Sequence, residues 1–267
     1  MSAELLKKTR MMNKALQSGS PEDENLINFD EMSAILSEMI NCNVYILGDG
    51  GALIGHHFLD GFKCDVMEKI VLEDGKMPAS YNETLIAAEE TVSNKPNVNK
   101  ICIFQGKECI FGDKITTIIP IYAGHKRQGT LMLGKFNVEF TDEDLILAEY
   151  GATMVGIEML RSKNKSEEEE NRERIAVQIT LDTLSYSEME AIEHIFSELE
   201  GDEGILVASR IADRVGITRS VIVNALRKFE SAGVIETKSL GMKGTYIRLL
   251  NKYLLEGIKS RTKSKRL

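Results

Sequence analysis

The sequence lacks any long apolar run, which argues against a membrane protein. No stretch approaches the roughly 18 consecutive apolar residues that a membrane-spanning helix needs, and the first eight residues lack the apolar centre of a signal peptide. We therefore predict a cytoplasmic protein with no membrane partner. The length of 267 residues allows two domains, and 43% hydrophobic with 28% charged residues is typical of globular proteins.

Cysteine and histidine are scarce and poorly placed for metal binding. No Cys-x-x-Cys motif occurs, and wide, irregular cysteine spacing favours buried free thiols over a metal or redox site. The adjacent pair His56 and His57 would point to opposite faces of a strand and would chelate poorly. We predict no metal site and no metal cofactor. The cysteines are Cys42, Cys64, Cys102 and Cys109.

Recognisable catalytic machinery is also missing. No Ser/His/Asp or Cys/His set stands in a familiar sequence context, and Asp142 with Asp144 is explained by the dipole of a helix that starts there. Residues 124–130 superficially resemble a phosphate-binding P-loop, but the lysine after the second glycine is absent and a strand follows. We predict no catalytic residue and no enzyme activity; a GTP-hydrolysing enzyme stays as the alternative.

Charge is distributed unevenly along the chain. Residues 1–160 carry 14 basic and 24 acidic side chains, whereas residues 205–267 carry 14 basic and only 4 acidic ones. A polyanion such as DNA would therefore be attracted only by the C-terminal quarter.

A helix-turn-helix pattern occupies residues 207–228. A short apolar-faced helix ends at Gly216, and Thr218 stands at the N-cap position of a second helix. One stripe of the second helix is apolar, which would place Arg219, Ser220 and Asn224 on the face away from the core. Such a helix fits the major groove of DNA. The apolar stripe comprises Val221, Ile222, Ala225, Leu226 and Phe229.

A wing follows this second helix. Residues 234–238 and 245–249 have strand character, and residues 241–244 form a basic, glycine-bearing tip between them. A β-hairpin in this position completes a winged helix-turn-helix domain. We expect the wing residues Lys238, Lys243 and Arg248 to hold phosphates.

The first half of the chain alternates helices with hairpins, which predicts an α+β fold. Expected helices cover residues 2–17, 31–40 (capped by Asp30), 64–73, 82–92 and 141–184, the last capped by Thr141. Expected hairpins join residues 43–47 to 52–58, 100–104 to 108–111, and 115–123 to 129–136.

This order resembles a GAF-type sensor domain, which closes a small-molecule pocket beneath its loops. We predict three parts: a sensing domain over residues 1–140, a long linker helix over 141–184, and a winged helix-turn-helix domain over 185–267.

The chain as a whole resembles the CodY family of global transcriptional regulators from low-GC Gram-positive bacteria. The likeness is densest in residues 144–153, 185–196 and 206–244. It implies a homodimer, or a higher oligomer, that mainly represses genes of nutrient and amino-acid metabolism from AT-rich palindromic operators in double-stranded DNA. The DNA-binding residues that it implies are Ala208, Ser209, Arg219, Ser220, Asn224, Lys228, Lys238, Lys243 and Arg248.

The resemblance also implies activation by a branched-chain amino acid (isoleucine, valine or leucine). The family's pocket residues would correspond to Met67, Val71, Met77, Pro78, Tyr81, Ile101, Ile103 and Phe104. Burying an aliphatic ligand side chain there would contribute roughly 1.5–3 kcal/mol; plain core packing is the alternative interpretation. Family members hold the ligand carboxylate with an arginine on the first of the two helices. Residues 64–73 contain none, so a lysine or backbone amides must replace it, and the nearby lysines are Lys63, Lys69 and Lys76.

GTP is a second effector in many members of the family. Glu158 and Lys163 match its nucleotide contacts on the linker helix, but the turn at residues 48–52 has no cation and carries Asp49. Each lost charge-assisted bond to a phosphate removes perhaps 1.5–3 kcal/mol. We therefore predict a weak or absent GTP response.

The expected mechanism is allosteric. An effector would reorder the loops near Met77 and Gly106, shift the linker helix and set the spacing of two winged helices in a dimer. Arg219, Ser220 and Asn224 would read base edges. The remaining alternative is a sensor module whose winged helix binds protein instead of DNA.

Overall fold

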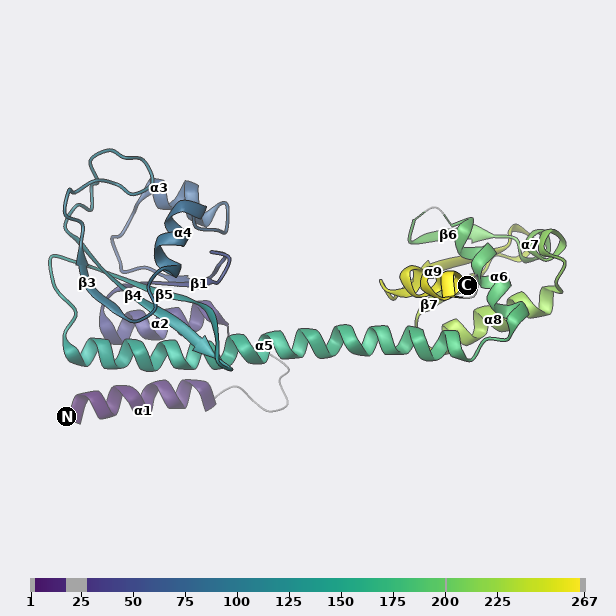
Figure 1. The fold of residues 1–267 in the computed structure, drawn as a ribbon, viewed down its shortest axis with the longest axis horizontal. Coiled ribbons are helices and arrows are strands. Elements are labelled where there is room, and N and C mark those ends of the chain that lie inside the picture. The colour runs from purple at the N-terminus through teal and green to yellow at the C-terminus, as the bar shows by residue number, and fades with distance from the viewer. Residues whose placement is uncertain (1–2, 18–27, 200, 265–267) are drawn as a thin grey trace. The chain divides into compact units, whose positions relative to one another are not determined.

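The computed structural model describes residues 3–17, 28–199 and 201–264. The chain divides into two compact units, Met1–Asn164 and Lys165–Leu267, called unit 1 and unit 2 below. None of the helices in the described part of the chain combines the length and the apolar character needed to span a membrane. Figure 1 shows the elements of each unit.

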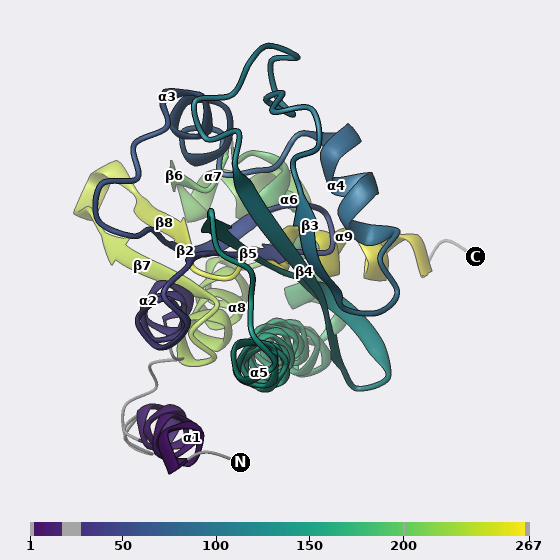
Figure 2. The same ribbon diagram turned by 90° about the vertical axis from the view of Figure 1, so that its left-hand side faces the viewer.

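Unit 1 is built on an antiparallel five-stranded sheet in the order β2-β1-β5-β4-β3. Figures 1 and 2 show α2 and α5 along one face of this sheet, and α3 and α4 on the other. The strands are β1 (Asn43–Gly48), β2 (Leu53–His57), β3 (Val92–Pro96), β4 (Lys114–Ala123) and β5 (Lys126–Phe136). The helices are α1 (Ala3–Gln17), α2 (Phe29–Ile40), α3 (Asp65–Met67), the π-helical turn η1 (Glu68–Leu72), α4 (Ala79–Ile86) and α5 (Asp142–Asp182).

Both faces of the central strands are buried. Alternate residues point to opposite faces, so Val44 and Ile46 of β1 join the core beneath α2 and α5, while Tyr45 and Leu47 join the core beneath α3 and α4. The strands therefore read as nearly continuous apolar runs. This is why the first and third predicted hairpins are confirmed as β1–β2 and β4–β5.

Helix starts agree with the prediction at α5 but not at α2. The Thr141 hydroxyl accepts a hydrogen bond from the Asp144 backbone N–H at 3.2 Å, which confirms the predicted cap. At α2 the N-cap is Asn28, whose side chain accepts from the Asp30 N–H, so the predicted cap at Asp30 was wrong. The Asp30 carboxylate instead accepts from the His56 backbone N–H at 2.8 Å, a contact that only the folded chain creates.

The predicted helix over residues 82–92 is confirmed only over residues 82–86. The helix α4 spans Ala79–Ile86, and the chain forms the edge strand β3 from Val92. Arg127 of β5 explains the early end, because its guanidinium donates to the carbonyls of Leu85 and Ala88, at 3.1 and 2.6 Å, and also to that of Ile86. Carbonyls at a helix end need such partners.

The predicted first helix of unit 1 is present, whereas most of the predicted second hairpin is not. The described part of the predicted first helix is α1, and residue 2 lies outside the described residues. The predicted hairpin over residues 100–111 is reduced to a single bridge between Ile101 and Glu108. The segment between β3 and β4 is therefore mostly irregular backbone.

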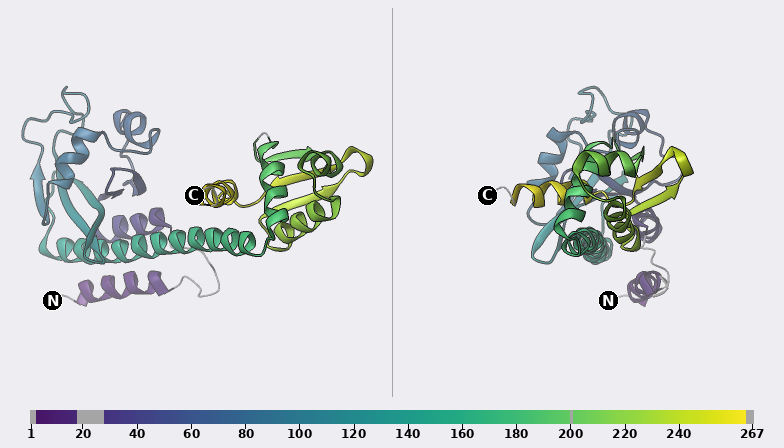
Figure 3. Two further views of the ribbon diagram at one scale, coloured as in Figure 1. Left: turned by 45° about the vertical axis from the view of Figure 1, so that its right-hand side comes forward. Right: turned by 90° about the vertical axis from the view of Figure 1, so that its right-hand side faces the viewer.

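Unit 2 is a winged helix built around a three-stranded sheet in the order β6-β8-β7, and Figure 3 shows it from two sides. The predicted wing is confirmed as the β7–β8 pair, whereas β6 was not predicted because it is only four residues long. Its elements are α6 (Tyr186–Ser197), β6 (Glu203–Leu206), α7 (Ala208–Val215), α8 (Arg219–Ser231), β7 (Ile235–Ser239), the short 3-10 turn η2 (Gly241–Lys243), β8 (Thr245–Leu249) and α9 (Leu254–Ser264).

A partly buried ion pair links α8 to the start of α6. The Lys228 ammonium donates to the Glu188 carboxylate at 2.7 Å and to the Thr183 carbonyl at 2.8 Å. Glu188 also closes a capping box with Ser185, in which each residue's side chain accepts from the other's backbone N–H. Burial acts to raise the pKa of Glu188, but the bonds from Lys228 and Ser185 outweigh it, so this pKa lies below its ordinary value of 4.5.

Gly129 of β5 tests how tightly the sheet of unit 1 is closed. A Cβ at this position would lie 1.9 Å from the Leu47 carbonyl oxygen, which is backbone and cannot move aside cheaply. We expect Gly129→Ala to lower the free energy of unfolding of unit 1 by about 3 kcal/mol, measured by urea denaturation. Gly50→Ala is the matched control, because nothing lies within 4 Å of a Cβ there. Equal stability of the two variants would contradict this packing.

Glu188 makes the stability of unit 2 acid-sensitive. A carboxyl whose pKa is depressed by folding contributes stability that is present above its unfolded pKa and is lost as pH falls through the folded value. We expect Glu188→Gln to lower the free energy of unfolding by about 1–2 kcal/mol at pH 7. Below pH 4.5, the Tm of this variant should fall less steeply with decreasing pH than that of the wild type. Glu190→Gln, on the same helix, is the control. An unchanged acid profile in Glu188→Gln would count against this role.

Candidate functional site

The turn between α7 and α8 has the geometry of a helix-turn-helix. Gly216 follows α7 in the left-handed conformation at φ 76°, which glycine adopts without steric cost. Thr218 occupies the N-cap position of α8 as predicted, but its side chain makes no capping bond to the backbone. Its hydroxyl lies 2.8 Å from that of Ser220 instead. Two hydroxyls are thus presented at the exposed start of α8.

The helix α8 has one buried face and one exposed polar face. The predicted apolar stripe is confirmed, with Phe229 and Ile222 fully buried and Val221 packed at the edge of the core. Arg219, Ser220 and Asn224 are all exposed on the other face. Arg227, which was not among the predicted DNA contacts, is also exposed on this helix. This face can donate and accept hydrogen bonds to base edges.

The wing presents further cations. Lys243 lies in η2, between the two strands of the wing, and the neighbouring Met242 is fully exposed. Lys238 of β7 is exposed, and Arg248 of β8 lies 3.8 Å from Glu236 in a solvent-exposed pair. Exposed pairs of this kind are weak, so a phosphate can replace Glu236 as the partner of Arg248.

Three other predicted DNA contacts have different surroundings. Ser209 is exposed near the start of α7, and Ala208 beside it is partly buried. Lys228 stays a candidate contact, although in this structure its ammonium is held by Glu188 and Thr183. Arg210 of α7 is exposed and was not named from the sequence.

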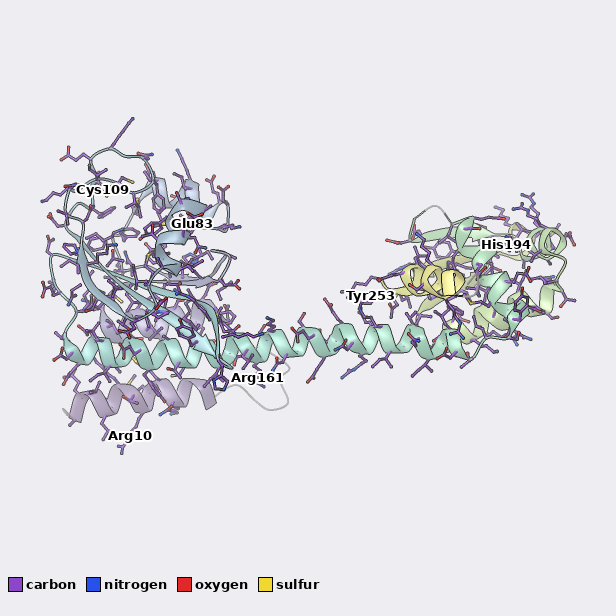
Figure 4. All side chains as sticks on the ribbon, in the orientation of Figure 1. Arg10, Glu83, Cys109, Arg161, His194 and Tyr253 are labelled. Carbon is purple, nitrogen blue, oxygen red and sulfur yellow. The ribbon has the colours of Figure 1, made fainter. Side chains whose placement is uncertain are left out.

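A cavity of about 460 Å³ lies in unit 1 between α3, α4 and the irregular segment before β4. Its wall includes five of the eight predicted effector residues, namely Met67, Tyr81, Ile101, Ile103 and Phe104. The rings of Tyr81 and Phe104 meet edge to face with centroids 5.8 Å apart. Cys109, labelled in Figure 4, lines the cavity from the irregular segment.

The three remaining predicted effector residues do not line this cavity. Val71 and Met77 are buried in the adjoining core, as the core-packing interpretation expected, and Pro78 occupies the N-cap position of α4. Sequence reasoning missed several residues that do line the cavity, among them Tyr45, Phe62, Lys95, Phe111 and Lys114. They come from β1, the loop before α3, β3, the irregular segment and β4, so no local pattern could have grouped them.

The aromatic wall of the cavity is neutral. Burial raises the pKa of Tyr81 to about 12 and raises that of Tyr45 further, so both phenols keep their protons. The Tyr81 hydroxyl donates to the Met132 sulfur at 3.4 Å.

Of the cysteines, Cys42 is fully buried with its pKa raised to about 12 by burial, as a buried free thiol should be. The other three, Cys64, Cys102 and Cys109, are partly buried and line the cavity.

The two predicted nucleotide contacts lie differently on α5. Glu158 is buried, and its Oε1 has no hydrogen-bond partner among the described residues. Arg161, which the sequence analysis did not name, lies 4.0 Å from the other carboxylate oxygen, and Lys163 is exposed. At the β1–β2 turn the Asp49 carboxylate accepts from the Gly50 N–H. Within the described ranges, no three His, Cys, Asp or Glu side chains are grouped to hold a metal ion.

The sequence matches two family descriptions, the CodY GAF-like domain over residues 4–183 and the CodY helix-turn-helix domain over residues 202–261. Similar curated proteins include those named global transcriptional regulator CodY from Clostridium botulinum (strain Hall) and Clostridium perfringens (strain SM101). Each is 54% identical over 256 residues, which is 96% of this chain and 98% of the relative.

Among solved structures, the cofactor-binding GAF domain of the nutrient sensor CodY from Clostridium difficile is 29% identical. The match covers 60% of this chain and 99% of the Clostridium difficile chain, with a TM-score of 0.40. A GAF domain from a Coxiella burnetii phosphoenolpyruvate-protein phosphotransferase is 16% identical over 62% of this chain and 99% of that chain, with a TM-score of 0.41.

The predicted α+β fold of a GAF-type domain followed by a helix-turn-helix domain is therefore confirmed. With two family matches that together span most of the sequence and 54% identity over nearly all of it, the chain belongs to the CodY family.

Proposed function

We infer that this protein is a transcription regulator that binds double-stranded DNA through α7, α8 and the wing. The observation that carries this inference is the amphipathic structure of α8, whose apolar face is buried while Arg219, Ser220 and Asn224 are exposed together. The excess of basic over acidic side chains in residues 205–267 supplies the attraction to phosphates. The curated relatives are named as regulators, which favours this function over the GTP-hydrolysing alternative.

We propose a branched-chain amino acid as the effector, bound in the cavity of unit 1. The cavity is walled by Met67, Ile101, Ile103 and aromatic rings, which suit an aliphatic side chain. The Clostridium difficile relative is described as a nutrient sensor with a cofactor-binding GAF domain, which supports a small-molecule ligand here. Isoleucine, valine and leucine share the required chemistry.

The proposed coupling to DNA runs through α5. Lys135 of β5 donates to Asp144 of α5 at 2.7 Å, and both side chains are almost fully buried. Residues further along the same helix, Val177 and Leu181, belong to the core of unit 2. An effector that favours one position of β5 would thereby bias α5, provided that it binds the two arrangements with different affinity. A homodimer on a palindromic, AT-rich operator is the assembly that we propose.

GTP is the less favoured effector. Besides the match of Glu158 and Lys163 to the family's nucleotide contacts, the unpartnered Oε1 of Glu158 favours GTP, because it could accept from a ligand N–H group. The β1–β2 turn carries the acidic Asp49, and phosphates placed beside it would be repelled.

Arg219 and Lys243 should contribute to DNA binding in different ways. We expect Lys243→Ala to weaken binding to all duplexes alike and to reduce the salt slope by about one. Arg219→Ala should weaken the free energy of operator binding by about 1–3 kcal/mol and should also reduce the preference for operator over random DNA. Fluorescence anisotropy at several salt concentrations, with duplexes enriched from a random pool by the wild-type protein, measures both effects.

Lys7→Ala is the control for loss of one positive charge, because Lys7 is exposed on α1 in unit 1. An Arg219→Ala variant that loses affinity equally on operator and random DNA would contradict base reading. Absence of any salt-dependent DNA binding by the wild type would favour the protein-binding alternative.

Effector dependence follows from the cavity and the β1–β2 turn. We expect isoleucine to raise operator affinity about tenfold, and GTP alone to change it less than twofold, because no cation of the turn meets the phosphates. Operator binding measured with isoleucine, GTP, both or neither tests this. Tight GTP binding, seen as a Kd in the micromolar range or below, would overturn the GTP part and leave the amino-acid part standing.

A further inference from the structure

The cavity of unit 1 has an unbalanced charge. None of the described residues that line it is acidic, and two of them, Lys95 and Lys114, are cationic. The rest of the wall consists of apolar, aromatic, thiol, hydroxyl and amide groups. The apolar body and the carboxylate of an amino acid match this wall, and the amide and hydroxyl oxygens of Asn97, Asn99 and Thr116 are lining groups that can accept from its ammonium group.

The two lysines differ in their surroundings. Lys95 lies on the edge strand β3 and is exposed to solvent. Lys114, the first residue of β4, is mostly buried. A charge surrounded by protein interacts far more strongly with a bound anion than one surrounded by water. Lys114 is therefore the stronger candidate to meet the negative end of a ligand.

The Lys114 ammonium has no counter-charge in the folded chain. No hydrogen bond or ion pair joins it to another described residue, and its neighbour Asp113 is paired with Lys100 at 2.6 Å. The titratable groups that act on it are the thiols of Cys64, Cys102 and Cys109. No carboxylate is among these groups, so none of them is an ordinary partner for a lysine ammonium.

Burial of this unpaired cation is costly. Desolvation lowers the pKa of Lys114 below its ordinary value of 10.5, and only the three thiols act in the opposite direction. Buried charges in proteins are normally paired. An anion that enters the cavity would offset part of this penalty, and no contact within the described chain does so.

We propose that Lys114 holds the carboxylate of the amino-acid effector, in place of the arginine that residues 64–73 lack. This assignment rests on the proposed function of the cavity and adds which side chain recognises the charged end of the ligand. Lys63, Lys69 and Lys76, the lysines first considered, do not line the cavity. A lysine offers one point charge where an arginine offers a two-pronged contact, so recognition here depends mainly on charge.

Backbone hydrogen bonds join Lys114 to the segments that form the cavity wall, so a ligand bound at Lys114 can also shift that wall. Its backbone N–H donates to the Phe111 carbonyl, and its carbonyl accepts from the Asn97 N–H, both at 3.2 Å. The Asn97 side chain in turn donates to the Ile101 carbonyl at 3.2 Å. A carboxylate bound at Lys114 therefore lies where β4 meets both parts of the irregular segment that forms the wall.

The test compares a ligand with and without its negative charge. Isothermal titration calorimetry of the full chain is carried out with L-isoleucine and with L-isoleucinamide, in which a neutral amide replaces the carboxylate. We expect the wild type to prefer isoleucine by about 10- to 100-fold, as a charge-assisted bond allows. Lys114→Met should lose this preference while keeping its affinity for the amide, and Lys114→Arg should retain the preference.

Lys95→Met is the matched control, because it removes the other lysine of the cavity and should leave the preference intact. Near-ultraviolet circular dichroism establishes that each variant is folded, and Lys114→Gln replaces Lys114→Met if the latter is not. A preference that persists in the folded Lys114 variant, or is lost in Lys95→Met, overturns the assignment to Lys114 alone. A wild type that binds neither ligand, nor valine nor leucine, overturns the proposed effector and this assignment with it.

Discussion

Burial of both faces of β1, β5 and β4 is the constraint on which unit 1 depends. On one face Val44 and Ile46 pack into the core beneath α2 and α5. On the other face Tyr45 and Leu47 pack into the core beneath the layer that contains α3 and α4. A register slip of one residue would exchange these two sets and leave neither face matched to its cover. Gly129 tightens the constraint, since β5 approaches the Leu47 carbonyl too closely for any side chain. The cavity lies in the second layer, where irregular backbone, not a helix, precedes β4.

The helix α5 gives the two units one shared element. Asp144 near its start is held by Lys135 of the sheet, and Asp144's pKa lies below its ordinary value because the bonds from Lys135 and Thr141 outweigh its desolvation. Val177 and Leu181 near its end are buried in the core of unit 2. Both cores therefore contain residues of one continuous helix, and this helix is the route that the proposed coupling uses. The physical requirement is differential affinity, not distance.

The basic side chains of this protein fall into three groups that differ in burial and in their partners. Exposed cations on α8 and the wing remain available to phosphates because their partners are weak or solvent-exposed, as with Arg248 and Glu236. Lys228 is instead committed to Glu188 and Thr183, where it fixes α8 against the start of α6. Lys114 is the third case, a mostly buried cation without an anion in the described chain. Basic side chains thus stabilise the fold at Lys228 and, by our proposals, bind DNA on α8 and the wing and bind the effector at Lys114, and their neighbours distinguish these roles.

The sequence by itself determined what local periodicity and local charge encode. The helix-turn-helix could be predicted because a 3.6-residue apolar stripe, Gly216 and the wing's alternation lie within one short stretch, and the central hairpins because their apolar runs are continuous. Tertiary structure decided the rest. Arg127 binds the carbonyls at the end of α4 from a distant strand, the Asp30 carboxylate accepts from His56 of β2 instead of capping α2, and the cavity draws its lining from segments far apart in the chain. The environment of Lys114 is not visible in its neighbours along the sequence, because burial and the absence of a partner are properties of the folded chain.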